Sequence, residues 1–108
     1  AGAAIRKMAD ALTGNTIWLK AADRQAETDS IVYFLRDGTG RAKWRDEAPT
    51  SIKWLLQTDG KLCVAEQRRD FRDQDCASLS IDGDAVTLAA PDRPAIPWRL
   101  LKGNALKP

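Results

Sequence analysis

The dipeptide Asp-Gly occurs three times in this chain, each time between segments in which apolar and polar residues alternate. The copies are Asp37-Gly38, Asp59-Gly60 and Asp82-Gly83, spaced about 22 residues apart. Asp-Gly suits the type I′ turn, because both central residues of that turn need positive φ. Three such turns between alternating segments predict sequential hairpins, which together form an antiparallel meander.

Alternation with a period of two residues continues through most of the chain after Asn15. Ile52, Trp54 and Leu56, for example, share one face of a predicted strand. This pattern is typical of an antiparallel sheet that buries one face. It predicts eight strands, at residues 16–20, 31–36, 41–45, 51–58, 61–67, 76–81, 85–89 and 96–101. Pro97 places the last of them at a sheet edge or at a strand start.

The first residues follow a different period. Ile5, Met8 and Leu12 recur at helical spacing, and Gly14 follows as a stop signal. We therefore expect a helix at residues 3–12.

The 108 residues correspond to a single domain, residues 1–108. We expect the helix to be followed by a β-meander over residues 16–101. Eight short strands in meander order tend to close on themselves, because closure removes sheet edges. The prediction is a mainly β fold, a small antiparallel meander β-barrel with the helix at one mouth. The alternative is a two-sheet β-sandwich.

The two cysteines, Cys63 and Cys76, are 13 positions apart. They are either two buried free thiols or a disulfide, and we favour a disulfide between paired neighbouring strands. Their spacing is not the C-x-x-C pattern of a redox-active pair. A structural disulfide persists in an oxidising compartment, so we expect a periplasmic or secreted protein. We expect no signal peptide within this chain, and no apolar run is long enough for a membrane span.

Several kinds of chemistry are excluded by composition. The chain has no histidine, which removes Ser-His-Asp catalysis and His-ligated zinc, and two cysteines cannot complete a four-thiolate site. We expect no metal and no cofactor. A net charge of +2 with interspersed signs disfavours nucleic-acid binding. We expect no enzymatic activity either, and only Glu47 and Glu66 lie in contexts worth checking for acid–base chemistry.

One polar segment, residues 66–75, carries alternating charges around a single phenylalanine. It is either a solvated loop with weak ion pairs or a recognition loop, since arginine and aromatic residues are enriched at binding hot spots. A second polar segment, residues 21–30, is a further contact candidate. The residues predicted to bind a protein partner are Arg68, Arg69, Phe71 and Arg72.

The chain has four tryptophans, at positions 18, 44, 54 and 98. They either fill the barrel core or line a pocket for an apolar ligand. The predicted pocket residues are Trp18, Tyr33, Trp54 and Trp98.

Several short motifs follow one another along the chain. They are Gly14-Asn15-Thr16, the Tyr33–Thr39 hairpin, Asp59-Gly60-Lys61-Leu62-Cys63, then Cys76, and a closing Gly103-Asn104-Ala105-Leu106. This pattern, which covers most of residues 10–106, resembles small exported proteobacterial proteins, many of them without a known function. The resemblance implies a periplasmic, lipocalin-like β-domain and no catalytic residue.

Three functions are compatible with these observations. The first is a non-enzymatic binding or inhibitory module that contacts a protein partner through loops at one barrel end. The second is a calycin-like carrier of a small apolar ligand. The third is an accessory subunit of a larger envelope assembly.

Overall fold

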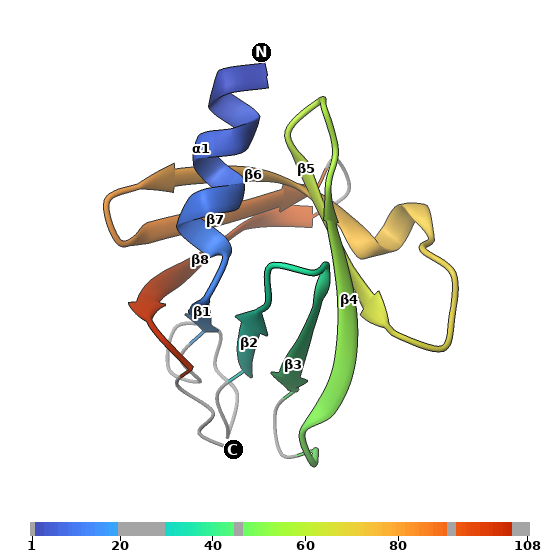
Figure 1. Ribbon diagram of the computed structural model, residues 1–108. Coiled ribbons are helices and arrows are strands. Elements are labelled where there is room, and N and C mark those ends of the chain that lie inside the picture. Colours follow the sequence, from blue (N-terminus) through green and yellow to red (C-terminus); the bar gives the residue numbers. More distant parts are fainter. Residues whose placement is uncertain (1, 20–29, 45–46, 91–92, 105–108) are drawn as a thin grey trace.

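A computed structural model describes residues 2–19, 30–44, 47–90 and 93–104. Eight strands, β1 to β8, form a closed barrel in which each strand pairs antiparallel with the next and β8 pairs with β1 (Figure 1). The predicted meander barrel with an N-terminal helix is therefore confirmed, and the sandwich alternative is wrong. The elements are α1 (Gly2–Leu12), β1 (Asn15–Leu19), β2 (Ser30–Phe34), β3 (Thr39–Lys43), β4 (Thr50–Leu56), β5 (Lys61–Glu66), the 3-10 helix η2 (Asp73–Asp75), β6 (Cys76–Asp82), β7 (Ala85–Ala90) and β8 (Arg93–Lys102).

The last strand differs most from its predicted span, because β8 begins at Arg93 rather than at residue 96. Pro97 lies inside this strand and pairs with Thr87 of β7. The pairing of β8 with β1 runs from Lys102 only as far as Arg99. Pro97 therefore lies where the ladder to β1 has ended, which fits a residue with no backbone N–H to donate.

The Asp-Gly hairpins are present, but in the first two the turn geometry differs from the predicted type I′. In the first, the N–H of Gly38 donates to the carbonyl of Leu35, so Gly38 follows the two central turn residues, and its φ is 88°. The β4–β5 hairpin repeats this arrangement. In the third hairpin Asp82 pairs with Ala85, so the glycine of the motif is the first loop residue. In the first two hairpins the aspartate side chain is an acceptor, since Asp37 Oδ1 accepts from the N–H of Thr39 at 3.0 Å and Asp59 Oδ1 from the N–H of Lys61 at 3.1 Å.

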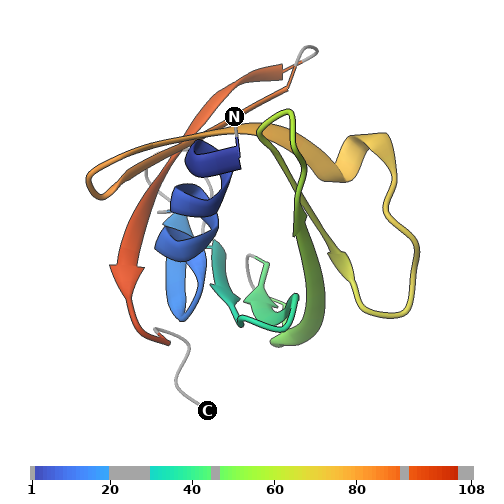
Figure 2. The same cartoon turned by 45° about the horizontal axis from the view of Figure 1, so that its top comes forward.

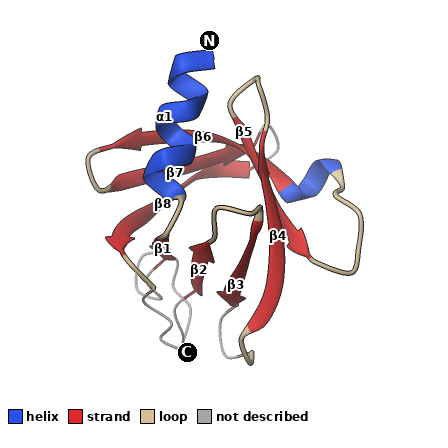
Figure 3. Ribbon diagram, in the orientation of Figure 1, coloured by secondary structure: helices blue, strands red, loops and turns tan. Residues whose placement is uncertain are grey.

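Because neighbouring strands are antiparallel, their connections leave the barrel at alternate ends. The three Asp-Gly turns join β2 to β3, β4 to β5 and β6 to β7, so they share one end with α1, and we call this the turn end (Figure 3). The other four connections, including the one that carries η2, leave from the opposite end, which we call the loop end. The predicted contact loop at residues 21–30 belongs to one of these connections, but residues 20–29 lie outside the described part of the chain.

Helix α1 lies across the barrel opening at the turn end (Figure 2). Leu12 at its last position is fully buried in the barrel core, and Met8 packs against the same core. The helix ends where the side chains of Thr13 and Asn15 donate to the carbonyls of Ala9 and Ala11, each at 2.8 Å. The carbonyl of Ala9 also accepts from the backbone N–H of Thr13, whereas the bond from Asn15 satisfies the carbonyl of Ala11, a kind of group that a helix terminus otherwise leaves unpaired.

The Gly-Asn-Thr motif also ties the two ends of the meander together. Asn15 Oδ1 accepts from the backbone N–H of Gly103 at 3.0 Å, and Thr16 Oγ1 donates to the carbonyl of Gly103 at 2.6 Å. The two motifs at the ends of the meander, around Gly14 and Gly103, thus help to close the barrel between β1 and β8.

The core consists of side chains on the inner face of the strands. Phe34 on β2 is fully buried and makes an edge-to-face contact with Trp54 on β4, with ring centroids 5.2 Å apart. The other buried members come from every strand: Ile17, Leu19, Val32, Ala42, Ile52, Leu62, Leu79, Val86 and Trp98, with Leu12 from the helix. The aromatic contact lies at the turn end, because the indole N–H of Trp54 donates to the carbonyl of Leu35 beside the β2–β3 turn.

Candidate functional site

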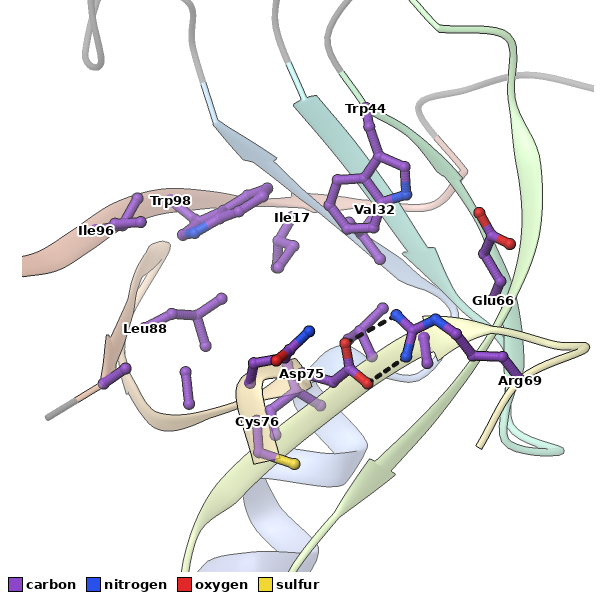
Figure 4. A pocket seen from close by; sticks show the side chains of 16 residues that line it. Ile17, Val32, Trp44, Glu66, Arg69, Asp75, Cys76, Leu88, Ile96 and Trp98 are labelled. Atoms are coloured by element: carbon purple, nitrogen blue, oxygen red, sulfur yellow. Dashed lines mark hydrogen bonds and ion pairs between the residues drawn. The ribbon is translucent and has the colours of Figure 1, made fainter. Parts of the chain in front are cut away.

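A cavity of about 330 Å³ lies at the loop end of the barrel. Its position follows from lining residues such as Trp44, Glu66 and Ala90, which lie where strands give way to the connections at that end. Its walls are largely apolar and come from β1, β2, β5, β6, β7 and β8 (Figure 4): Ile17, Val32, Leu62, Val64, Ala77, Leu88, Ile96 and Trp98. A volume of this size falls at the lower end of the range for small-molecule pockets.

The apolar walls follow directly from the two-residue alternation. Ile17 is the register partner of Val32, and Leu88 is that of Ile96, so each pair presents its side chains to the same inner face. Two inner positions near the mouth, Ala77 and Ala90, carry only a methyl group. These small side chains leave space unfilled at the loop end, in contrast to Phe34 and Trp54 at the turn end.

An ion pair lies at the mouth of the cavity. Arg69 binds Asp75 through two parallel hydrogen bonds, from Nη1 to Oδ2 at 2.6 Å and from Nη2 to Oδ1 at 2.9 Å. Asp75 Oδ2 also accepts from the backbone N–H of Arg72 at 2.8 Å. The hydrogen bonds from Arg69 lower the pKa of Asp75, and the same pairing raises the pKa of Arg69. The side chain of Asp75 is only 9% exposed, so the pair fixes one position of the β5–β6 connection.

The predicted disulfide between Cys63 and Cys76 is confirmed, and it spans the base of this connection. The two residues are register partners on β5 and β6, with Cα atoms 4.0 Å apart. The β5–β6 ladder holds only three register pairs, fewer than any other ladder described in the barrel. The disulfide therefore closes the shortest seam of the barrel, which is also a wall of the cavity. Such a bond indicates an oxidising, extracytoplasmic setting.

The four predicted partner-binding residues all lie in this connection, but in different surroundings. Arg69 is engaged by Asp75, and the ring of Phe71 is half-buried with Lys53 Nζ 4.8 Å above its centroid. Arg68 and Arg72 have exposed side chains. The connection is therefore anchored by the disulfide, the ion pair and the cation–π contact, and it presents two arginines to solvent.

The four predicted pocket residues do not share one cavity. Trp98 lines the cavity, whereas Trp54 lies against Phe34 at the turn end and donates its indole N–H to the carbonyl of Leu35 at 2.9 Å. Trp18 and Tyr33 alternate with the inward Ile17 and Val32, which places them on the outer face. Barrel closure thus separates tryptophans that the sequence pattern grouped together.

Trp44 is a lining residue that the predicted pocket set omits. It follows β3 directly, on the rim opposite the Arg69–Asp75 pair (Figure 4). The signal in the sequence was its position two residues beyond the inward Ala42, which continues the inner-face alternation past the end of the strand. Glu66, one of the two acids singled out from the sequence, also lines the mouth, and Glu47 is exposed.

The indole of Trp98 has an unusual environment. The residue is 8% exposed, and its Nε1–H is buried without a hydrogen-bond partner among the residues that the structure describes. In Figure 4 the ring nitrogen lies on the side of Ile96 and Leu88, both aliphatic. A buried donor left unpaired costs about 1–3 kcal/mol, so a group that supplied an acceptor there would gain binding energy.

Within the ranges that the structure describes, no three potential ligands among Asp, Glu, Cys and His gather as a metal site requires. Among the described helical residues, none forms a segment long and apolar enough to cross a membrane. A scan of protein-family models finds no match to this chain, and no curated protein sequence matches it significantly.

Proposed function

We propose that this protein is a non-enzymatic carrier that binds a small apolar ligand in the cavity at the loop end of the barrel. The observation that supports the proposal is the apolar cavity of about 330 Å³ inside a closed barrel. At about 30 Å³ for each water-sized group, that volume corresponds to a ligand of roughly ten non-hydrogen atoms. The lipocalin-like motif pattern and the disulfide support a periplasmic or secreted location for such a carrier.

The test is to fill the cavity from one wall. Ala77 on β6 lines the cavity, whereas Ala89 on β7 is the register partner of Ser78 and lies on the outer face. We expect Ala77→Leu to weaken the binding of naphthalene, measured by calorimetry or by quenching of tryptophan fluorescence, at least tenfold. The matched control Ala89→Leu should retain wild-type affinity. If no neutral apolar molecule of this size binds the wild type, the carrier proposal is wrong.

A second proposal, of a different class, is contact with a protein partner through the β5–β6 connection. It is supported by the anchoring of that connection and by the exposure of Arg68 and Arg72. The test is the combined variant Phe71→Ala and Arg72→Ala, assayed against a partner captured from envelope extract. An unchanged affinity excludes this surface as the contact site. A role as an accessory subunit of an envelope assembly remains a prediction that the same capture experiment addresses.

A further inference from the structure

Two of the inward tryptophans, Trp54 and Trp98, differ in how their indole N–H is satisfied. The indole N–H of Trp54 donates to the carbonyl of Leu35 at 2.9 Å, so the fold itself supplies its acceptor. The indole N–H of Trp98 is buried and has no acceptor within the described part of the chain. Buried indole donors usually find a partner, so the exception calls for an explanation.

The described side chains that flank Trp98 along β8 and across β7 are aliphatic. Its inner-face neighbours along β8 are Ile96 and Leu100, and its register partner on β7 is Val86. Leu88, on the same cavity wall, is also aliphatic. Since no described residue supplies an acceptor, an acceptor on a molecule inside the cavity would satisfy Nε1.

We infer that the ligand carries a neutral oxygen acceptor, such as a carbonyl, that binds the Nε1–H of Trp98. This inference rests on the proposed carrier function. The charged groups that line the cavity, Glu66, Arg69 and Asp75, lie across it from Trp98 (Figure 4). An anionic oxygen at Trp98 would be desolvated with no cation of the described lining beside it, which is costly. Because Nε1 is buried, this contact requires that Leu88 or Ile96, both half-buried, move aside when the ligand binds.

The ligand class is therefore an apolar molecule of about ten non-hydrogen atoms with one neutral acceptor at its buried end. Its remaining polar groups, where present, lie towards the Arg69–Asp75 pair at the mouth. The structure assigns Trp98 as the residue that sets this specificity.

The test compares tetralin with 1-tetralone, which share a bicyclic carbon frame and differ by one carbonyl oxygen. Affinities are measured by calorimetry for the wild type and for Trp98→Phe, which keeps an aromatic ring and removes the N–H. The affinity ratio of ketone to hydrocarbon should fall about tenfold in Trp98→Phe. Comparing ratios cancels the different hydration of the two probes. The control is Trp18→Phe, which replaces an indole on the outer face and should leave the ratio unchanged.

A spectroscopic measurement on the wild type covers the case in which Trp98→Phe does not fold. The indole resonance of Trp98 in ¹H–¹⁵N spectra, assigned by elimination with Phe variants at positions 18, 44 and 54, should shift downfield with 1-tetralone and much less with tetralin. A matching carboxylate, tetralin-1-carboxylate, should bind more weakly than the ketone. Tighter binding of that anion would contradict a neutral acceptor.

The outcomes separate this inference from the function on which it rests. If both probes bind but their ratio does not depend on Trp98, or the Trp98 resonance does not move, the acceptor assignment is wrong and the carrier proposal stands. If neither probe binds the wild type, the carrier proposal fails and the assignment falls with it.

Discussion

The two ends of the barrel are built in different ways. At the turn end, short hairpins hold the strands together, and Leu12 of α1 packs with Phe34 and Trp54 beneath the helix. At the loop end, small side chains such as Ala77 leave a cavity, and a disulfide and an ion pair brace the wall. Side chains pack together at the turn end, whereas the loop end contains a cavity whose wall is stabilised by the disulfide and the ion pair.

The difference shows how a small barrel combines stability with space for a ligand. Cross-links that act between β5 and β6 replace packing that a filled interior would provide. We therefore expect changes at the turn end to lower global stability and leave ligand binding intact in the folded protein. Changes at the loop end should alter binding as well.

The largest expected effect is at the turn end. Leu12 is fully buried, so Leu12→Ala should lower the free energy of unfolding by about 2–5 kcal/mol. Urea denaturation measures this loss. Leu55→Ala is the matched control, because Leu55 is 48% exposed and should change stability much less. Equal losses of stability in the two variants would contradict the conclusion that Leu12 of α1 packs in the barrel core.

The next effect is at the loop end. Removing the disulfide in a Cys63→Ala and Cys76→Ala variant should cost about 3 kcal/mol, because the unfolded chain regains the entropy of an open loop of this length. Binding of naphthalene should weaken beyond what the loss of stability explains, since both residues belong to the seam beside the cavity. Unchanged affinity in the folded double variant would show that the β5–β6 seam holds without the disulfide.

A smaller effect is expected at a single turn. Gly60 adopts a φ of 87°, a left-handed conformation that costs other residues about 1–2 kcal/mol. Gly60→Ala should lower the melting temperature accordingly, although a Cβ at this position meets no other atom within 4 Å. Ligand affinity should stay at the wild-type level. A loss of affinity in this variant would mean that the two ends are coupled.

The smallest effect concerns the ion pair at the mouth. The pKa of Asp75 is lowered in the folded chain from its ordinary value of 3.8. Its stabilisation is therefore present above that value and is lost as the pH falls through the lowered folded pKa. Asp75→Asn should remove this acid dependence. It should also speed hydrogen exchange at the backbone amide of Arg72, which donates a hydrogen bond to Asp75 Oδ2. An unchanged exchange rate at Arg72 would show that the pair does not order the connection.

Much of the fold can be predicted from the sequence because its signals are local. Alternation and Asp-Gly turns lie in adjacent residues, and they predict the strand number, the meander order and the pairing of Cys63 with Cys76. The geometry of the first two turns differs from the predicted type I′. The hydrogen bond from the N–H of Gly38 to the carbonyl of Leu35, for example, determines which residues lie at the centre of the turn. The start of β8 also differs from the prediction. Its prolines argue against a strand in the sequence, but this part of β8 pairs with β7 and not with β1.

The cavity depends on tertiary structure. Alternation places Trp54 and Trp98 on the inner face of their strands, but the height of each ring along the barrel axis depends on register and closure. Closure places Trp54 against Phe34 at the filled end and Trp98 beside the cavity. The sequence by itself determined that the chain forms eight antiparallel strands with an inner apolar face. The tertiary structure decided which part of that face stays open, because the space depends on side chains that come together only when β8 meets β1.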